Sequence, residues 1–185
     1  MTDGAWNAAA DTSNWGDAEN WSDGKVPTGQ ATFTASSQSY LTFAADTAAT
    51  IEAITFPEGA QPFSFVITDL EKKPALTISG AGVSNSSLAV QSFNVASYGT
   101  YGEPQLVFAG SATAGDDTVV YYSGPTDLEG SYGGGTIAFT ETSDAGSARF
   151  TVRTGKVSPR NKVPPGQDKK KFSSSVGGTI GFFDK

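Results

Sequence analysis

The phrase Gly-Gly-Thr-Ile-x-Phe occurs twice in this chain, at Gly134–Phe139 and at Gly177–Phe182. A variant of its apolar half, Leu106–Phe108, precedes both. A recurring phrase indicates that the chain stacks one structural unit repeatedly, because each unit buries its apolar face only against its neighbours. We therefore predict that Phe108, Phe139 and Phe182 occupy equivalent positions in successive turns and lie buried in one interior row.

The spacing of the repeat points to coils of similar length with one insertion. Leu106 and Ile137 are 31 positions apart, whereas Ile137 and Ile180 are 43 apart. The additional residues fall in a segment rich in lysine and proline, which we place at about 156–172. Equivalent coils with a loop inserted into one of them are typical of solenoids.

Short strand patterns, in which apolar and small or polar residues alternate, cover the rest of the chain. Gly, Pro, Asp and Asn punctuate the gaps between them. We expect strands at Ala31–Ala35, Tyr40–Ala44, Ile51–Phe56, Phe63–Thr68, Ala75–Ser79, Leu88–Val95, Gln105–Ala109, Thr118–Tyr122, Gly135–Thr140, Ala148–Val152 and Thr179–Phe183. The predicted fold is an all-β solenoid, and the alternative is an antiparallel β-sandwich, because strand spacing alone fits both.

The first 30 residues form a distinct block that contains all three tryptophans, Trp6, Trp15 and Trp21. Asp and Asn recur there at every third position from residue 11 to residue 23, a spacing that favours successive tight turns. We predict that residues 1–30 cap the first coil of a solenoid that extends over residues 31–185.

Composition excludes several kinds of chemistry. The chain has no Cys and no His, so disulfides, Cys/His zinc sites, Cys nucleophiles and His-based triads are ruled out. No apolar run reaches the length of a membrane span, and the first residues lack the pattern of a signal peptide. We expect a mature segment of an extracellular or cell-surface protein, begun with an added Met.

The charge of −7 is unevenly distributed. Nine of the 12 Lys and Arg residues lie between residue 149 and residue 185. A candidate anion- or partner-binding surface within that stretch comprises Arg160, Lys162, Lys169, Lys170 and Lys171. Its expected partners are acidic polysaccharide, lipid head groups, or the acidic part of a neighbouring copy. Nucleic acid fits less well, because the basic stretch lacks interleaved aromatic residues and the remainder of the chain is acidic.

Two constellations invite a chemical interpretation. Asp116 and Asp117, with Arg149 or Arg153, are the best available catalytic set, but a solvated turn with arginines on or beside a strand is the favoured interpretation. A set of tyrosines offers flat rings for stacking on sugars, although stacked strand side chains are the favoured interpretation: Tyr98, Tyr101, Tyr121, Tyr122 and Tyr132. We assign no catalytic residue, no metal site and no cofactor.

The motifs together resemble a bacterial family. They are Trp6…Asn14-Trp15…Asn20-Trp21…Pro27…Ala31-x-Phe33, Ile54-x-Phe56, Leu76-x-Ile78-x-Gly80-x-Gly82, and Phe139…Ser143-x-Ala145-Gly146-x-Ala148. This pattern resembles the autotransporter-associated β-strand repeat proteins over nearly the whole chain, except Lys156–Lys171. The resemblance implies a single-stranded, right-handed parallel β-helix of the passenger type on the bacterial surface. The resemblance concerns the passenger-type repeats and does not extend to the family's C-terminal membrane barrel.

The function expected from these features is structural. We predict a non-enzymatic extracellular or cell-surface segment that serves as a stalk or an adhesin and associates with itself through its ends. The alternatives are a carbohydrate-binding module with its ligand along one face, and a fragment of a carbohydrate-active enzyme.

Overall fold

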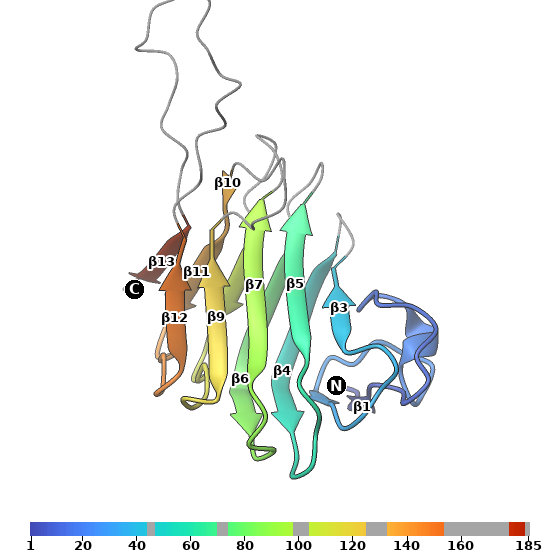
Figure 1. Ribbon diagram of the computed structural model, residues 1–185. Helices are drawn as coiled ribbons and strands as arrows, with labels where there is room; N and C mark the ends of the chain where they lie inside the picture. Colours follow the sequence, from blue (N-terminus) through green and yellow to red (C-terminus); the bar gives the residue numbers. More distant parts are fainter. Residues whose placement is uncertain (44–46, 70–73, 98–103, 125–132, 154–177, 184–185) are drawn as a thin grey trace, which may run out of the picture.

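The computed structural model describes residues 1–43, 47–69, 74–97, 104–124, 133–153 and 178–183 (Figure 1). The chain is a β-solenoid of about four turns, in which each turn contributes one strand to each of two facing sheets. The only helical element among these residues is the short 3-10 helix η1 (Ala18–Asn20). The prediction of an all-β solenoid is therefore confirmed.

Sheet 1 contains, in spatial order, β1 (Gly4–Ala5), β2 (Gln30–Thr32), β4 (Ala48–Phe56), β6 (Ala75–Asn85), β8 (Gln105–Phe108), β11 (Thr136–Thr140) and β13 (Thr179–Phe183). Sheet 2 contains β3 (Tyr40–Thr42), β5 (Ser64–Asp69), β7 (Gln91–Ser97), β9 (Val119–Ser123) and β12 (Arg149–Val152). The short β10 (Gly133–Gly134) pairs with β7. From β2 to β9, and again from β11 to β13, strands that follow one another along the chain alternate between the sheets, as a coiling chain requires.

The direction of pairing decides between the two predicted folds. Every neighbouring pair along both sheets is parallel, and only β10 runs antiparallel to its partner, β7. The strands of sheet 1 run opposite to those of sheet 2, as the arrows of β4 and β7 show (Figure 1). Parallel neighbours need a crossover between them, and here the facing sheet supplies it. The antiparallel sandwich is excluded.

The repeated phrase produces the register that the sequence predicts. Phe108 pairs with Phe139, and Phe139 with Phe182. Their rings stack with centroids 5.0 Å and 4.8 Å apart. The predicted burial of all three rings is wrong at one position: Phe139 is 2% exposed, whereas Phe182 is 65% exposed. No further strand of sheet 1 is described beyond Phe182, so one side of its ring lacks a covering coil.

Sheet 2 carries a matching row of aromatic rings on its inner face. Phe65, Phe93, Tyr121 and Phe150 stack in sequence, with centroids 4.5, 5.0 and 4.9 Å apart. Rings from the two rows also meet edge to face across the core, as in Phe108 with Tyr121 and Phe139 with Phe150. Such contacts add to the apolar area that each ring buries.

One irregularity lengthens the middle strands beyond their predicted limits. The pairing of β4 with β6 shifts register between Ile51 and Ala53, and β6 continues to Asn85. Gly82 lies at this shift with a positive φ of 88°. Its backbone also bridges Thr113 on the next coil. A glycine suits this corner because it adopts positive φ readily and allows the two backbones to approach closely.

The N-terminal residues pack against the first coil. Trp21 meets Trp6 and Trp15 edge to face, with centroids 5.1 and 4.8 Å apart, and all three indoles are buried. Phe33 and Phe43 complete this cluster from the solenoid side. β1 pairs in parallel with β2, so this block also adds a short strand to sheet 1. Apolar surface is consequently covered at this end of the molecule.

Candidate interaction site at the open end

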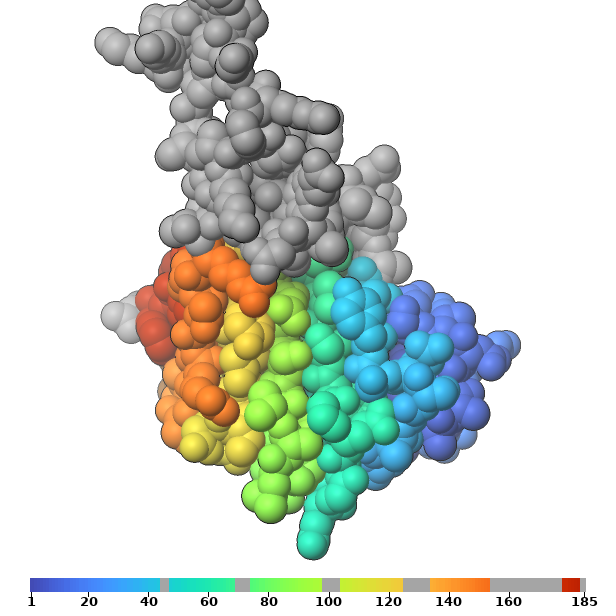
Figure 2. All heavy atoms as spheres, viewed as in Figure 1, coloured from blue at the N-terminus to red at the C-terminus, as the bar shows by residue number. Residues whose placement is uncertain are grey.

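The two ends of the solenoid differ in what they expose. The N-terminal end carries the buried tryptophan cluster, whereas the opposite end consists of β12 and β13 (Figure 1). The same two ends bound the space-filling view, where the first residues lie opposite the last two strands (Figure 2). We call the surface formed by Arg149–Val152 and Thr179–Phe183 the open end.

The open end is uneven because the sheets stop at different levels. β12 is the last strand of sheet 2 and pairs with β9, while β13 pairs with β11, which precedes β12 in the chain. Sheet 1 therefore extends one strand further than sheet 2 in the described residues. We call this extra strand, β13, the overhang. An edge strand of this kind presents backbone N–H and C=O groups on its unpaired side.

The side chains of the open end are largely apolar. Phe182, Phe183 and Val152 are 65%, 52% and 49% exposed, which places them among the most exposed large apolar residues of the described chain. The overhang carries no charged side chain, since it reads Thr-Ile-Gly-Phe-Phe. Clustered exposed apolar residues beside unpaired strand edges are typical of an interaction surface.

The predicted anion-binding residues Arg160, Lys162, Lys169, Lys170 and Lys171 lie outside the described residues, as does the predicted insertion. That surface therefore stays a prediction from sequence. Two further arginines of the basic stretch, Arg149 and Arg153, are described, and both have partners. The Nε of Arg149 donates to the Asp117 carbonyl oxygen at 2.6 Å. The Arg153 guanidinium lies 4.5 Å from the centre of the Tyr122 ring.

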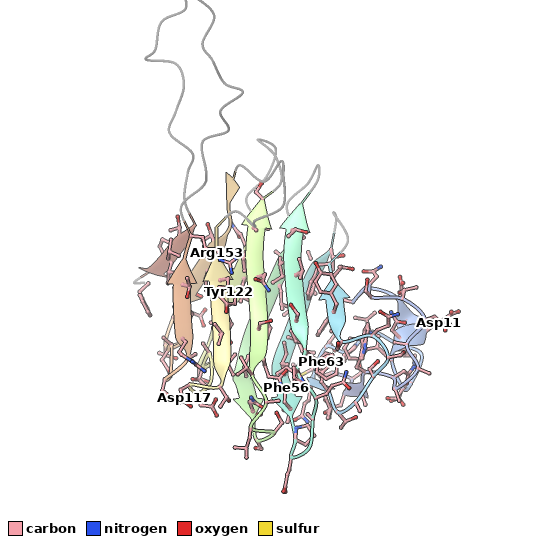
Figure 3. All side chains as sticks on the ribbon, viewed as in Figure 1. Asp11, Phe56, Phe63, Asp117, Tyr122 and Arg153 are labelled. Atoms are coloured by element: carbon pink, nitrogen blue, oxygen red, sulfur yellow. The ribbon has the colours of Figure 1, made fainter. Side chains whose placement is uncertain are left out.

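The candidate catalytic side chains, those of Asp116 and Asp117 with Arg149 or Arg153, make separate local contacts in the structure. Asp116 accepts hydrogen bonds from the backbone N–H and the hydroxyl of Thr118, so its carboxylate caps a local turn. Asp117 contributes its backbone carbonyl rather than its carboxylate to Arg149. Asp117 precedes β9 and Arg153 follows β12, and Figure 3 places them toward opposite ends of these strands. These groups thus serve turns and the sheet surface.

The tyrosines divide between the core and the surface. Tyr121 is fully buried, and its hydroxyl donates to the Ala114 carbonyl oxygen at 2.7 Å. Its ring belongs to the stacked aromatic row of sheet 2 and is not accessible to a sugar. Tyr122 lies on the outer face of sheet 2 beside Arg153 (Figure 3). The other three candidates, Tyr98, Tyr101 and Tyr132, lie outside the described residues.

Burial raises the pKa of the Tyr121 phenol well above its ordinary value, and the nearby Asp116 carboxylate adds to this effect. The folded state therefore holds the neutral phenol, while the unfolded chain ionises above a pH of about 10. The contribution of the neutral Tyr121 phenol to the free energy of unfolding is therefore fully present below a pH of about 10, and it is lost as the pH rises above that value. We expect Tyr121→Phe to flatten this alkaline decline, at a cost near neutral pH of about 1–2 kcal/mol for the unsatisfied carbonyl. Urea unfolding at several pH values measures both effects, and an unchanged alkaline slope in the variant would contradict the assignment.

Three further findings bear on classification. Comparison with family models, with curated proteins and with solved structures finds no match. Within the described ranges, no helix is long and apolar enough to cross a membrane. The same ranges bring no three His, Cys, Asp or Glu side chains together at a possible metal site. The fold alone defines the class, and the chain is a β-solenoid protein.

Sequence reasoning expected self-association through the ends of the solenoid, but it did not predict which side chains are exposed there, because residue type does not reveal exposure. Phe139 and Phe182 stand in the same phrase and have the same inner position in sheet 1, yet their exposure differs greatly. Val152 likewise follows the alternation of a core strand. The only signal in the sequence is that the phrase at Gly177–Phe182 is the last of its kind in this chain.

Proposed function

We propose that this protein is a non-enzymatic structural module of the extracellular or cell-surface type, which adheres through the open end of its solenoid. A single comparison carries the proposal: Phe182 stacks on Phe139 as a core residue does, yet it remains 65% exposed. An apolar ring with one covered face and one open face is suited to receive another β-structure. Strand addition at a sheet edge supplies both backbone hydrogen bonds and pockets for alternate side chains.

The asymmetry between the two ends supports this function over a passive rod. Capping residues keep the N-terminal end polar, with Asp3, Asp11 and Glu19 exposed. The open end has no comparable charged cover on its last strand. Natural sheets usually protect such edges with charges, prolines or bulges, so the uncharged apolar strand β13 favours a role in binding.

An adhesion assay with protein-coated beads tests the proposal. Beads that carry the wild-type chain are expected to clump, and Phe182→Glu is expected to abolish clumping because it buries a charge at the contact. Val90→Glu is the matched control, since Val90 is an exposed apolar residue that directly precedes β7, and β9 separates β7 from β12. Wild-type beads that stay dispersed would contradict the proposal.

A glycan array distinguishes the adhesive proposal from the alternative of a carbohydrate-binding module. Glycan binding that survives Phe182→Glu would place the ligand on a side face of the solenoid and favour that alternative. Binding neither to glycans nor to coated beads would leave the adhesive proposal without support.

A further inference from the structure

The open end is shaped so that the overhang of one copy can pair with the open end of a second copy. Among the described residues, sheet 1 extends one strand beyond sheet 2 at the open end, so no described strand lies next to β12 opposite β13; we call this position the notch. The strands of the two sheets run in opposite directions (Figure 1). A rotation of 180° about an axis parallel to the strands exchanges the positions of the two sheets and keeps the strand direction. It therefore places the overhang of one copy in the notch of another.

We propose that the open end binds a second copy of this chain, with β13 of each copy lying antiparallel to β12 of the other. This inference rests on the proposed function, because it names the partner of the same surface. In this arrangement sheet 1 of one copy continues sheet 2 of the other, and both terminal edges become paired. The contact is isologous, as two-fold interfaces in homodimers are.

The aromatic core supports a second copy over an unrelated partner. In successive coils an inner ring of sheet 1 meets a ring of sheet 2 edge to face: Phe108 with Tyr121 at 5.7 Å, and Phe139 with Phe150 at 5.8 Å. Phe182 stands in the next coil, where no described residue of sheet 2 continues the series. The proposed rotation brings Phe182 of the partner copy opposite it, so the ring pairing continues across the interface.

The closed N-terminal end limits the assembly to two chains. Its tryptophans are buried, and Met1 and Tyr40 are the only large apolar side chains that it exposes in the described residues, so it offers little apolar surface to Phe182. Head-to-tail growth would require such a complement at every contact. With one adhesive end per chain, association closes at the dimer.

Sedimentation equilibrium on the 185-residue chain tests the stoichiometry. The wild-type chain is expected to reach a dimer and no larger species, and Phe182→Glu is expected to weaken dimerisation by at least about 100-fold, as loss of an interface hot spot does. Val90→Glu should dimerise as the wild type does. Far-UV circular dichroism and urea unfolding establish that each variant is folded. Because a glutamate at an inner position can disturb the last coil, Phe182→Ala, which is expected to weaken the dimer less severely, serves as a second variant.

Engineered cysteines test the orientation, since the natural chain has none. Thr151 on β12 and Thr179 on β13 are exposed positions on the outer faces of their strands. A short bis-maleimide reagent should link a chain carrying Thr151→Cys to a chain carrying Thr179→Cys. The chain with Thr179→Cys alone should form little cross-linked product, because the two copies of β13 lie in opposite sheets.

The outcomes separate this inference from the proposed function. Links between Thr151→Cys and Thr179→Cys chains within a dimer support the inference. Efficient linking of Thr179→Cys to itself, or to Ala5→Cys at the N-terminal end, overturns the proposed orientation while leaving adhesion by the open end intact. A chain that stays monomeric at all concentrations, with no response to Phe182→Glu in sedimentation or in the bead assay, overturns both.

Discussion

Replacement of Phe93 by alanine is expected to lower the free energy of unfolding by about 3–5 kcal/mol, the usual cost of removing a buried phenylalanine. Phe93 is fully buried at the centre of the aromatic row of sheet 2. Its ring stacks on Phe65 at 4.5 Å on one side and on Tyr121 at 5.0 Å on the other. The strands on both sides hold these neighbours in register, so the structure has little freedom to close the cavity.

Urea unfolding measures this loss, with circular dichroism and tryptophan fluorescence followed in parallel. All three tryptophans lie within the first 21 residues, so fluorescence reports on the N-terminal block while circular dichroism reports on the whole sheet. Coincident transitions would indicate that the coils unfold together. Phe93→Leu is the control, and its expected cost of about 1–2 kcal/mol separates lost ring stacking from lost volume. A loss below about 1 kcal/mol in Phe93→Ala would contradict the packing described above.

Replacement of Gly82 by alanine is expected to cost about 3 kcal/mol or more, because two unfavourable effects combine. The first is the positive φ of 88°, which side chains other than that of glycine rarely adopt. The second is a collision with the next coil. A Cβ atom at Gly82 would lie 2.1 Å from the carbonyl oxygen of Thr113 and 2.4 Å from its nitrogen. Both contacts are with backbone, which has little freedom to move away.

Gly59 provides a matched control for the second effect. Its φ of 80° is nearly the same, but a Cβ atom there would meet nothing within 4 Å. Gly59→Ala is therefore expected to cost only the conformational penalty, about 1 kcal/mol. The difference between the two variants, measured by urea unfolding, isolates the close approach of neighbouring coils. Equal losses would indicate that the coils at Gly82 are further apart than the structure has them.

Local sequence patterns predicted much of this fold because the repeat unit is itself local. The strand expected at Thr179–Phe183 has those limits in the structure, and that expected at Gln105–Ala109 ends only one residue earlier. Alternating apolar residues define a strand and its buried face without reference to distant parts of the chain. The repeated phrase then fixes which strands lie side by side, since only one register stacks Phe108 on Phe139.

Local patterns failed where a neighbouring coil decides the outcome. The extension of β6 to Asn85 depends on a register shift against β4 and on the bridge from Gly82 to Thr113. The partner of Arg149 depends on how the turn before β9 meets β12. Neither relation is visible in the residues of one strand. The sequence favoured association through the ends, but the exposure of Phe182 could not be derived from it for the same reason, because exposure depends on what covers the ring.

The amino-acid sequence by itself determined the type of element, the inner face of each strand and the order in which coils stack, because these follow from alternation and repetition along the chain. Only the tertiary structure decided which of the repeated phenylalanines is buried and which is exposed. Phe139 and Phe182 have the same local surroundings, but a ring becomes buried only when side chains cover both of its faces. Whether both faces are covered depends on the neighbouring coils and not on the local sequence. In our proposal this difference makes Phe182, but not Phe139, part of an adhesive surface.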